Sequence, residues 1–99
     1  MTAPYITPAA AADLLAIWAY LADRSVTAAD GWLARVEAAI ETIGLYPEIG
    51  GQRPDIDAHG LRYFSPAKCK ATIVYRADSS AVRIIRVAGQ GRDLGGMRR

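Results

Sequence analysis

Residues 46–51, with the sequence YPEIGG, divide the chain into two halves that follow different hydrophobic patterns. Proline disfavours helix in the residue before it, and paired glycines favour a turn. Apolar residues recur at helical spacing before this segment, whereas β-branched and aromatic residues form short runs after it. A chain of 99 residues cannot support two separate cores. We therefore expect one α+β domain that spans residues 1–99.

Two helices are predicted before this segment. Thr7-Pro8 has the pattern of an N-cap followed by proline at the first helical position, so the first helix should begin there and end near Asp23. Helical spacing places one set of residues on an apolar face and a second set on the other face. The apolar set is Leu14, Ile17, Trp18 and Leu21, and the other set is Asp13, Tyr20 and Asp23.

The second helix is predicted to begin at Thr27, because Thr27 and Asp30 fit the capping-box spacing. Its apolar stripe continues with Leu33, Val36, Ile40 and Ile43, whereas Glu37 and Glu41 lie on a solvated face. The short connection between the helices predicts an antiparallel helical hairpin.

Three strands are predicted over residues 61–65, 69–76 and 81–88, where β-branched and aromatic residues are dense. The polar segment 77–80 makes the last two a hairpin. Together with a short β-prone pair, Tyr5-Ile6, the order is β-α-α-β-β-β. This order predicts an antiparallel sheet with the N-terminal helical hairpin packed on one face.

The net charge of +2 conceals an asymmetry. Residues 1–50 carry two cations and six acids, a balance of −4, whereas residues 51–99 carry ten cations and four acids, a balance of +6. The second half is therefore expected to meet an acidic partner. The longest uncharged apolar run, residues 14–22, is shorter than the ~18 residues of a membrane helix, and no basic signal region follows Met1. We expect no membrane association.

The common catalytic motifs are missing, because the sequence has no P-loop, HExxH, GxSxG or paired histidines. The single cysteine, Cys69, excludes a multi-thiolate zinc site and fits a reducing cytoplasm, so we expect no metal or cofactor. Lys68 and Lys70 could activate Cys69 as a thiolate nucleophile, but a small residue at a strand start is the simpler interpretation. His59 has no recognisable partner for general base catalysis.

Two further groups have a functional and a structural interpretation. Asp55 and Asp57 could form a carboxylate pair or a hard-metal site, but their Pro/Gly-rich surroundings favour solvated turn residues. Tyr63, Phe64 and Tyr75 could stack on nucleic-acid bases, whereas packing beneath the helices is the better interpretation for at least two of them.

Arginine dominates the second half, with Arg62, Arg76, Arg83, Arg86 and Arg92 on the predicted strands and the segment after them. Successive side chains of a strand point to opposite faces, so Arg83 and Arg86 should not share one stripe. Ordinary surface cations remain an alternative explanation for some of them.

Several segments in order resemble the RelE/ParE superfamily of bacterial type II toxins, and the ParE branch most closely. These segments are ITPAAAADLLAIWAYL, LYPEIGGQRPDI, GLRYF, IVYR and VRIIRVAGQGRDL, and they cover about residues 5–95. The resemblance implies a small cytoplasmic α+β toxin and a hetero-oligomer with an antitoxin. Such an antitoxin usually has a DNA-binding N-terminal domain and a flexible, acidic C-terminal half that wraps the toxin.

The two branches of the superfamily differ in target. The RelE branch resembles ribosome-dependent ribonucleases, which use cations to stabilise the reacting phosphate and usually a tyrosine near the C-terminus. Here Thr72 stands where that branch has an arginine, Arg92 matches its later arginine, and Arg98 stands where the tyrosine would be. Several ParE members instead poison DNA gyrase by trapping its cleaved complex, which requires no catalytic residue.

Three hypotheses follow from the resemblance. The first is a ParE-like toxin that binds gyrase, and the second is a RelE-like mRNA endonuclease that uses Arg62, Arg83 and Arg92. The third is a protein that retains only antitoxin binding. For the first, residues 73–87 are expected to be a structural hairpin, and the target is expected to contact Arg92, Asp93 and Leu94. The antitoxin is expected to contact Trp18, Trp32, Arg62, Arg76, Arg83 and Arg86.

Overall fold

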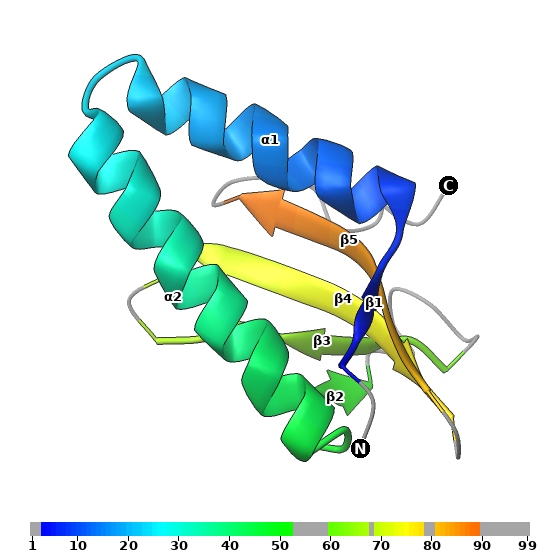
Figure 1. The fold of residues 1–99 in the computed structure, drawn as a ribbon. Coiled ribbons are helices and arrows are strands. Elements are labelled where there is room, and N and C mark those ends of the chain that lie inside the picture. The colour runs from blue at the N-terminus through cyan, green and yellow to red at the C-terminus, as the bar shows by residue number, and fades with distance from the viewer. Residues whose placement is uncertain (1–2, 53–59, 68, 79–80, 90–99) are drawn as a thin grey trace.

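The computed structural model describes residues 3–52, 60–67, 69–78 and 81–89, which form two helices on one face of a five-stranded sheet (Figure 1). The α+β class and the helical hairpin are therefore confirmed. The helices are α1 (Pro8–Ala22) and α2 (Val26–Leu45). The strands are β1 (Tyr5–Ile6), β2 (Gly51–Gln52), β3 (Arg62–Phe64), β4 (Ala71–Ala77) and β5 (Val82–Gly89).

The strands lie in the order β1-β5-β4-β3-β2. The predicted antiparallel pairing is confirmed from β2 to β5, whereas the pair of β1 and β5 is parallel, so the sheet as a whole is mixed. Thr7 fixes β1 on the outer edge of β5, because its backbone N–H and its hydroxyl both donate to the Ile84 carbonyl, at 3.1 and 2.8 Å. Strand β2 was not predicted, since two residues that include a glycine carry little strand propensity.

Helix α1 begins as the sequence predicts. The Thr7 hydroxyl accepts a hydrogen bond from the Ala10 N–H at 3.2 Å, and Pro8 occupies the first turn. The placement of Asp13 on the outer face is wrong, because its carboxylate accepts hydrogen bonds from β5. Asp13 lies three residues after Ala10 and four before Ile17, which both pack in the main core, so it lies at the border of the apolar face rather than opposite it.

The cap of helix α2 lies two residues earlier than the capping box predicts. The cap is Ser25, which has an extended backbone and accepts from the Ala28 N–H at 3.1 Å, so the assignment of Thr27 is wrong. Both hydroxyl residues suit a cap, and the tight connection after α1 selects the first. The predicted stripe is confirmed, since Val36, Ile40 and Ile43 are buried and Leu33 is partly buried, whereas Glu37 and Glu41 are exposed.

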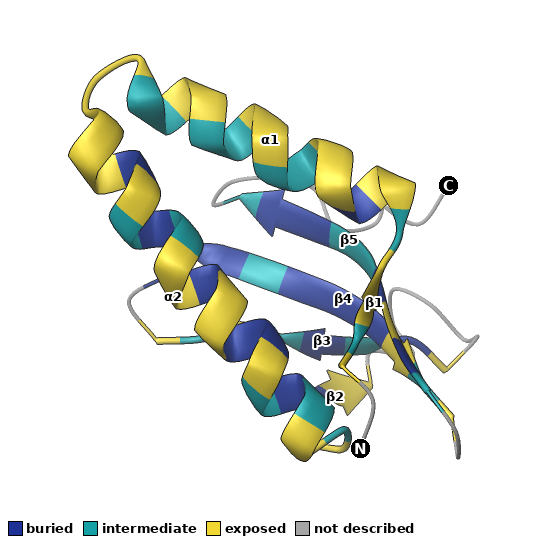
Figure 2. Cartoon of the chain, viewed as in Figure 1, coloured by how far each residue is buried: buried dark blue, intermediate teal, exposed yellow. Residues whose placement is uncertain are grey.

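The main core lies between the helices and the sheet (Figure 2). Its largest fully buried side chains include Ile43, Ile73, Tyr75 and Ile84. A smaller apolar cluster on the other face of the sheet comprises Leu61, Tyr63, Val74 and Ile85. Tyr75 and Phe64 pack in the main core, as the packing interpretation predicts, whereas Tyr63 packs on the far side. Over the described ranges, neither helix is long and apolar enough to cross a membrane.

Candidate functional site

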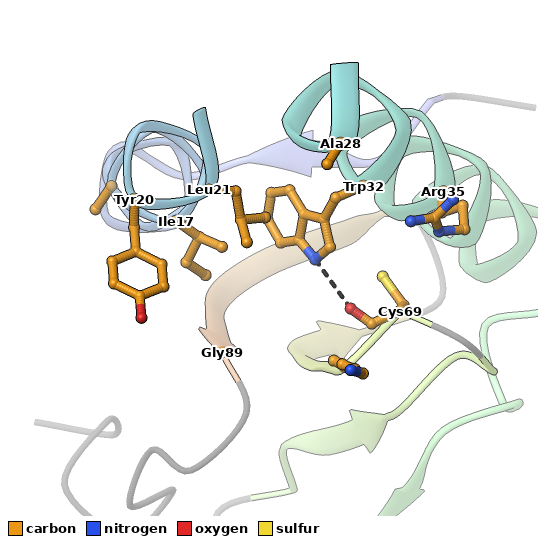
Figure 3. Close-up of a pocket in the computed structure, with 10 residues that line it drawn as sticks. Ile17, Tyr20, Leu21, Ala28, Trp32, Arg35, Cys69 and Gly89 are labelled. Atoms are coloured by element: carbon orange, nitrogen blue, oxygen red, sulfur yellow. Dashed lines mark hydrogen bonds between the residues drawn. The ribbon is translucent and has the colours of Figure 1, made fainter. Parts of the chain in front are cut away.

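A groove of about 840 Å³ opens where the C-terminal half of α1, the N-terminal half of α2 and the adjoining ends of β4 and β5 meet (Figure 3). Helix α1 contributes Ala16, Ile17, Tyr20 and Leu21, and helix α2 contributes Ala28, Trp32 and Arg35. The sheet side contributes Cys69, Lys70 and Gly89. The groove is therefore largely apolar, and its volume suits a side chain cluster of a partner segment.

Trp32 joins the wall of this groove to its floor. Its indole Nε1 donates to the Cys69 carbonyl at 2.9 Å (Figure 3), and the residue is only 5% exposed. Lys70 follows in the left-handed region with φ of 53°, which turns the chain into β4. Because left-handed backbone is rare for a side chain of this size, the bond from Trp32 to its neighbour helps to hold that turn.

Cys69 is a buried thiol rather than an exposed nucleophile. It is 1% exposed and belongs to the main core. Burial raises the pKa of the Cys69 thiol, and the nearby charge of Arg35 opposes that rise. A raised pKa keeps the thiol protonated near neutral pH and therefore poorly nucleophilic. This environment agrees with the interpretation of a small residue just before a strand.

The rim of the groove is cationic. Arg35 and Lys70 are exposed and line it, and none of its described lining residues is acidic. An apolar floor with positive charge at the rim matches an amphipathic segment that carries apolar anchors and carboxylates. Sequence analysis named Lys70 only as a neighbour of Cys69 and did not single out Arg35. The available signal for Arg35 was its position three residues after Trp32, on the same side of a helix.

Three of the predicted contact residues serve the fold instead of meeting in this groove. Trp18 ties the helices together, because its Nε1 donates to Asp30 Oδ1 at 2.9 Å. Arg86 pairs with Asp13, and this hydrogen bond raises the pKa of the Arg86 guanidinium. Arg62 donates to the Gly50 carbonyl at 2.7 Å and fixes the turn after α2. Trp32, by contrast, is a predicted contact residue that does line the groove.

Tyr75 also bonds to the turn that follows α2. Its hydroxyl donates to the Pro47 carbonyl at 2.7 Å and accepts from the Gly50 N–H at 2.8 Å. Burial raises the pKa of Tyr75, opposed by the bond from Gly50 and the charge of Arg62. Arg62 is the register partner of Tyr75 and bonds to the same turn, so it has a positioning role on the helix side of the sheet.

Arg76 and Arg83 lie apart from the groove. They are paired in register on β4 and β5. Both are exposed and alternate with Tyr75 and Ile84 of the main core, so they point away from the helices. As predicted, Arg83 and Arg86 do not form one stripe, since Arg86 reaches α1.

The remaining candidates lie outside the described residues. These are His59, Asp55 and Asp57, together with Arg92, Asp93 and Leu94. Within the residues that the structure does describe, no group of three or more His, Cys, Asp or Glu side chains could hold a metal ion.

The two helices, the mixed sheet and the groove between them define a small α+β domain. The structure titled "Chromosomal ParDE TA system from P. aeruginosa" has the same fold, with a TM-score of 0.74 and 21% identity over 91% of this chain and 97% of that chain. The family model described as "ParE toxin of type II toxin-antitoxin system, parDE" matches residues 5–94. The chain therefore belongs to the ParE toxin family and is the toxin of a type II toxin–antitoxin system. No curated protein matches it.

Proposed function

We propose that this toxin acts in the cytoplasm by binding DNA gyrase and trapping its cleaved complex, and that a cognate antitoxin neutralises it. Membership of the ParE family supports this proposal, because several ParE members poison DNA gyrase. A poison that acts by binding alone requires no catalytic residue of its own. The contact with gyrase is proposed to involve Arg92, Asp93 and Leu94, because the Arg92 guanidinium can make a bidentate contact with a carboxylate or a phosphate.

The antitoxin is proposed to place a flexible acidic C-terminal segment in the groove between α1 and α2. The single observation that carries this step is the apolar floor bordered by Arg35 and Lys70. Apolar side chains of the segment would contact Ile17, Leu21 and Trp32, and its carboxylates would approach the two cations. Affinity would then come from burial, and the rate of association from electrostatic steering.

The RelE-like alternative receives less support from the geometry. Arg62 lies on the helix side of the sheet and bonds to the Gly50 carbonyl, whereas Arg83 lies on the other face. Two guanidinium groups on opposite faces cannot stabilise one phosphate in a transition state. Thr72, at the position of an arginine in the RelE branch, forms a hydrogen bond of 2.8 Å with Ser65.

Induction of the toxin without its antitoxin tests the proposal in cells. Filamentation and a DNA-damage response should precede any fall in translation, and co-expression of the antitoxin should abolish both. Immediate translation arrest with cleaved mRNA would support the endonuclease instead. Undisturbed growth, with antitoxin binding intact, would leave only the third hypothesis.

A further inference from the structure

The five strands carry four arginines and no acidic residue. Two of the four are satisfied within the fold, since Arg86 pairs with Asp13 and Arg62 donates to the Gly50 carbonyl. The other two are Arg76 and Arg83. Neither forms a hydrogen bond or ion pair with any part of the chain that the structure describes.

Arg76 and Arg83 are direct cross-strand neighbours. Residues in such a pair have Cβ atoms about 5 Å apart, and like charges at that separation destabilise a sheet. Two guanidinium groups held side by side form a preset site for an anion that accepts hydrogen bonds from both. The local sheet therefore carries an unfavourable repulsion that an external anion would remove.

An exposed aromatic side chain extends this pair into a row. Tyr5 of β1 is the register partner of Arg83, so it lies on the same face, and it is 56% exposed. We propose that the row Tyr5–Arg83–Arg76 is a binding site for single-stranded DNA. The two arginines would bind backbone phosphates, and the tyrosine ring would stack on a base.

The chemistry of the row favours a nucleic acid over an acidic peptide. A peptide of the antitoxin type requires apolar anchor pockets, and the apolar groove lies on the helix side of the sheet. The row offers an aromatic ring, which can stack on a base, and two guanidinium groups, which can each donate two hydrogen bonds to a phosphate. The choice of DNA over RNA rests on the proposed function, because the substrate of gyrase is DNA.

Fluorescence anisotropy with the full-length toxin and a labelled oligothymidine of about ten nucleotides tests this site directly. Wild-type binding should weaken with salt. Arg76→Ala combined with Arg83→Ala should lower the affinity about ten-fold and reduce the slope of log K against log salt by about 1.4, or about 0.7 for each lost phosphate contact. Tyr5→Ala should weaken binding about five-fold without changing the slope.

Arg24→Ala is the matched control, because Arg24 is an exposed cation beside Tyr20 on the helix side. It should change the affinity less than about two-fold, since it removes no phosphate contact. The arginine double variant should melt at or above the wild-type temperature, because its like-charge repulsion is gone. If the alanine pair unfolds the sheet, Arg76→Gln with Arg83→Gln supplies the same comparison.

Several results would overturn the site. These are no binding by wild type at low salt, an unchanged salt slope in the double variant, or an equal loss in the Arg24 control. Tighter binding to duplex DNA, RNA or polyglutamate would also reject the assignment to single-stranded DNA. None of the binding failures affects the gyrase proposal, which is tested separately in cells and with purified gyrase.

Discussion

Asp13 of α1 and Arg86 of β5 form a two-pronged ion pair, with Nε to Oδ2 at 2.7 Å and Nη2 to Oδ1 at 2.9 Å. The same Oδ2 accepts the Val87 backbone N–H at 2.9 Å. One carboxylate thus joins the helix to the edge of β5 beyond the two residues that pair with β1. This contact holds α1 where it forms one wall of the groove.

Asp13→Asn should lower the free energy of unfolding by about 2 kcal/mol, because the hydrogen bonds to a partly buried charged pair are lost or weakened. Urea denaturation measures the change. Asp23→Asn at the exposed end of α1 is the control, with an expected change within about 0.5 kcal/mol. Equal effects of the two substitutions would show that Asp13 does not hold α1 on β5.

Two adjacent glycines provide a second matched pair. A Cβ at Gly50 would lie 2.7 Å from the Tyr75 hydroxyl and ring, whereas a Cβ at Gly51 meets nothing within 4 Å. Gly50→Ala should therefore cost about 1 to 3 kcal/mol of stability by overpacking, and Gly51→Ala should leave stability unchanged or higher. Thermal melting of both variants decides this, and similar melting temperatures would contradict the packing of Tyr75 beneath the turn.

Alkaline pH should weaken the fold through Tyr75. Burial raises the pKa of this tyrosine in the native state, so the unfolded chain loses its proton first, near its ordinary value of about 10. The stabilisation is complete below that pH and is lost as pH rises above it. The raised pKa of the Cys69 thiol acts in the same direction from about pH 9.

Urea midpoints measured from pH 8 to 11 test this dependence. Tyr75→Phe should be less stable at pH 8, because two hydrogen bonds are lost, but its stability should fall less steeply above about pH 10. The exposed Tyr46→Phe should retain the wild-type profile. A Tyr75→Phe curve parallel to wild type throughout would rule out this linkage.

The groove predicts how the antitoxin binds. Ala28→Trp should reduce antitoxin affinity at least about ten-fold by filling the groove, whereas Ala38→Trp, on an exposed part of α2 outside it, should change affinity little. Calorimetry measures both. Unchanged affinity in the Ala28 variant would place the antitoxin elsewhere.

Regular periodicity explains why the sequence predicts so much of the fold. The stripe of α2 and the β-branched runs of β4 and β5 depend on local spacing, and both agree with the structure. The Thr27 cap failed because two hydroxyl residues compete and tertiary connection selects one. Strand β2 and the parallel β1–β5 pair depend on long-range register, which no local pattern encodes.

The candidate site was less accessible to sequence reasoning. The asymmetry of charge drew attention to the arginines as a group. Only the structure shows that Arg62 and Arg86 form hydrogen bonds within the fold. It also shows that Arg76 and Arg83 are cross-strand neighbours. The groove joins residues of α1, α2 and the sheet that are more than 70 positions apart, such as Ile17 and Gly89. Its cations Arg35 and Lys70 become conspicuous only when these segments meet.

The most direct test of the central claim is DNA cleavage by purified gyrase in the presence of the toxin. Supercoiled plasmid, gyrase and ATP are incubated with the toxin, and the fraction of linear plasmid is measured after denaturation of the enzyme. We predict that linear DNA accumulates with increasing toxin and that prior addition of the antitoxin abolishes it. Unchanged supercoiling and no linear DNA, with a toxin that still arrests growth, would contradict gyrase poisoning.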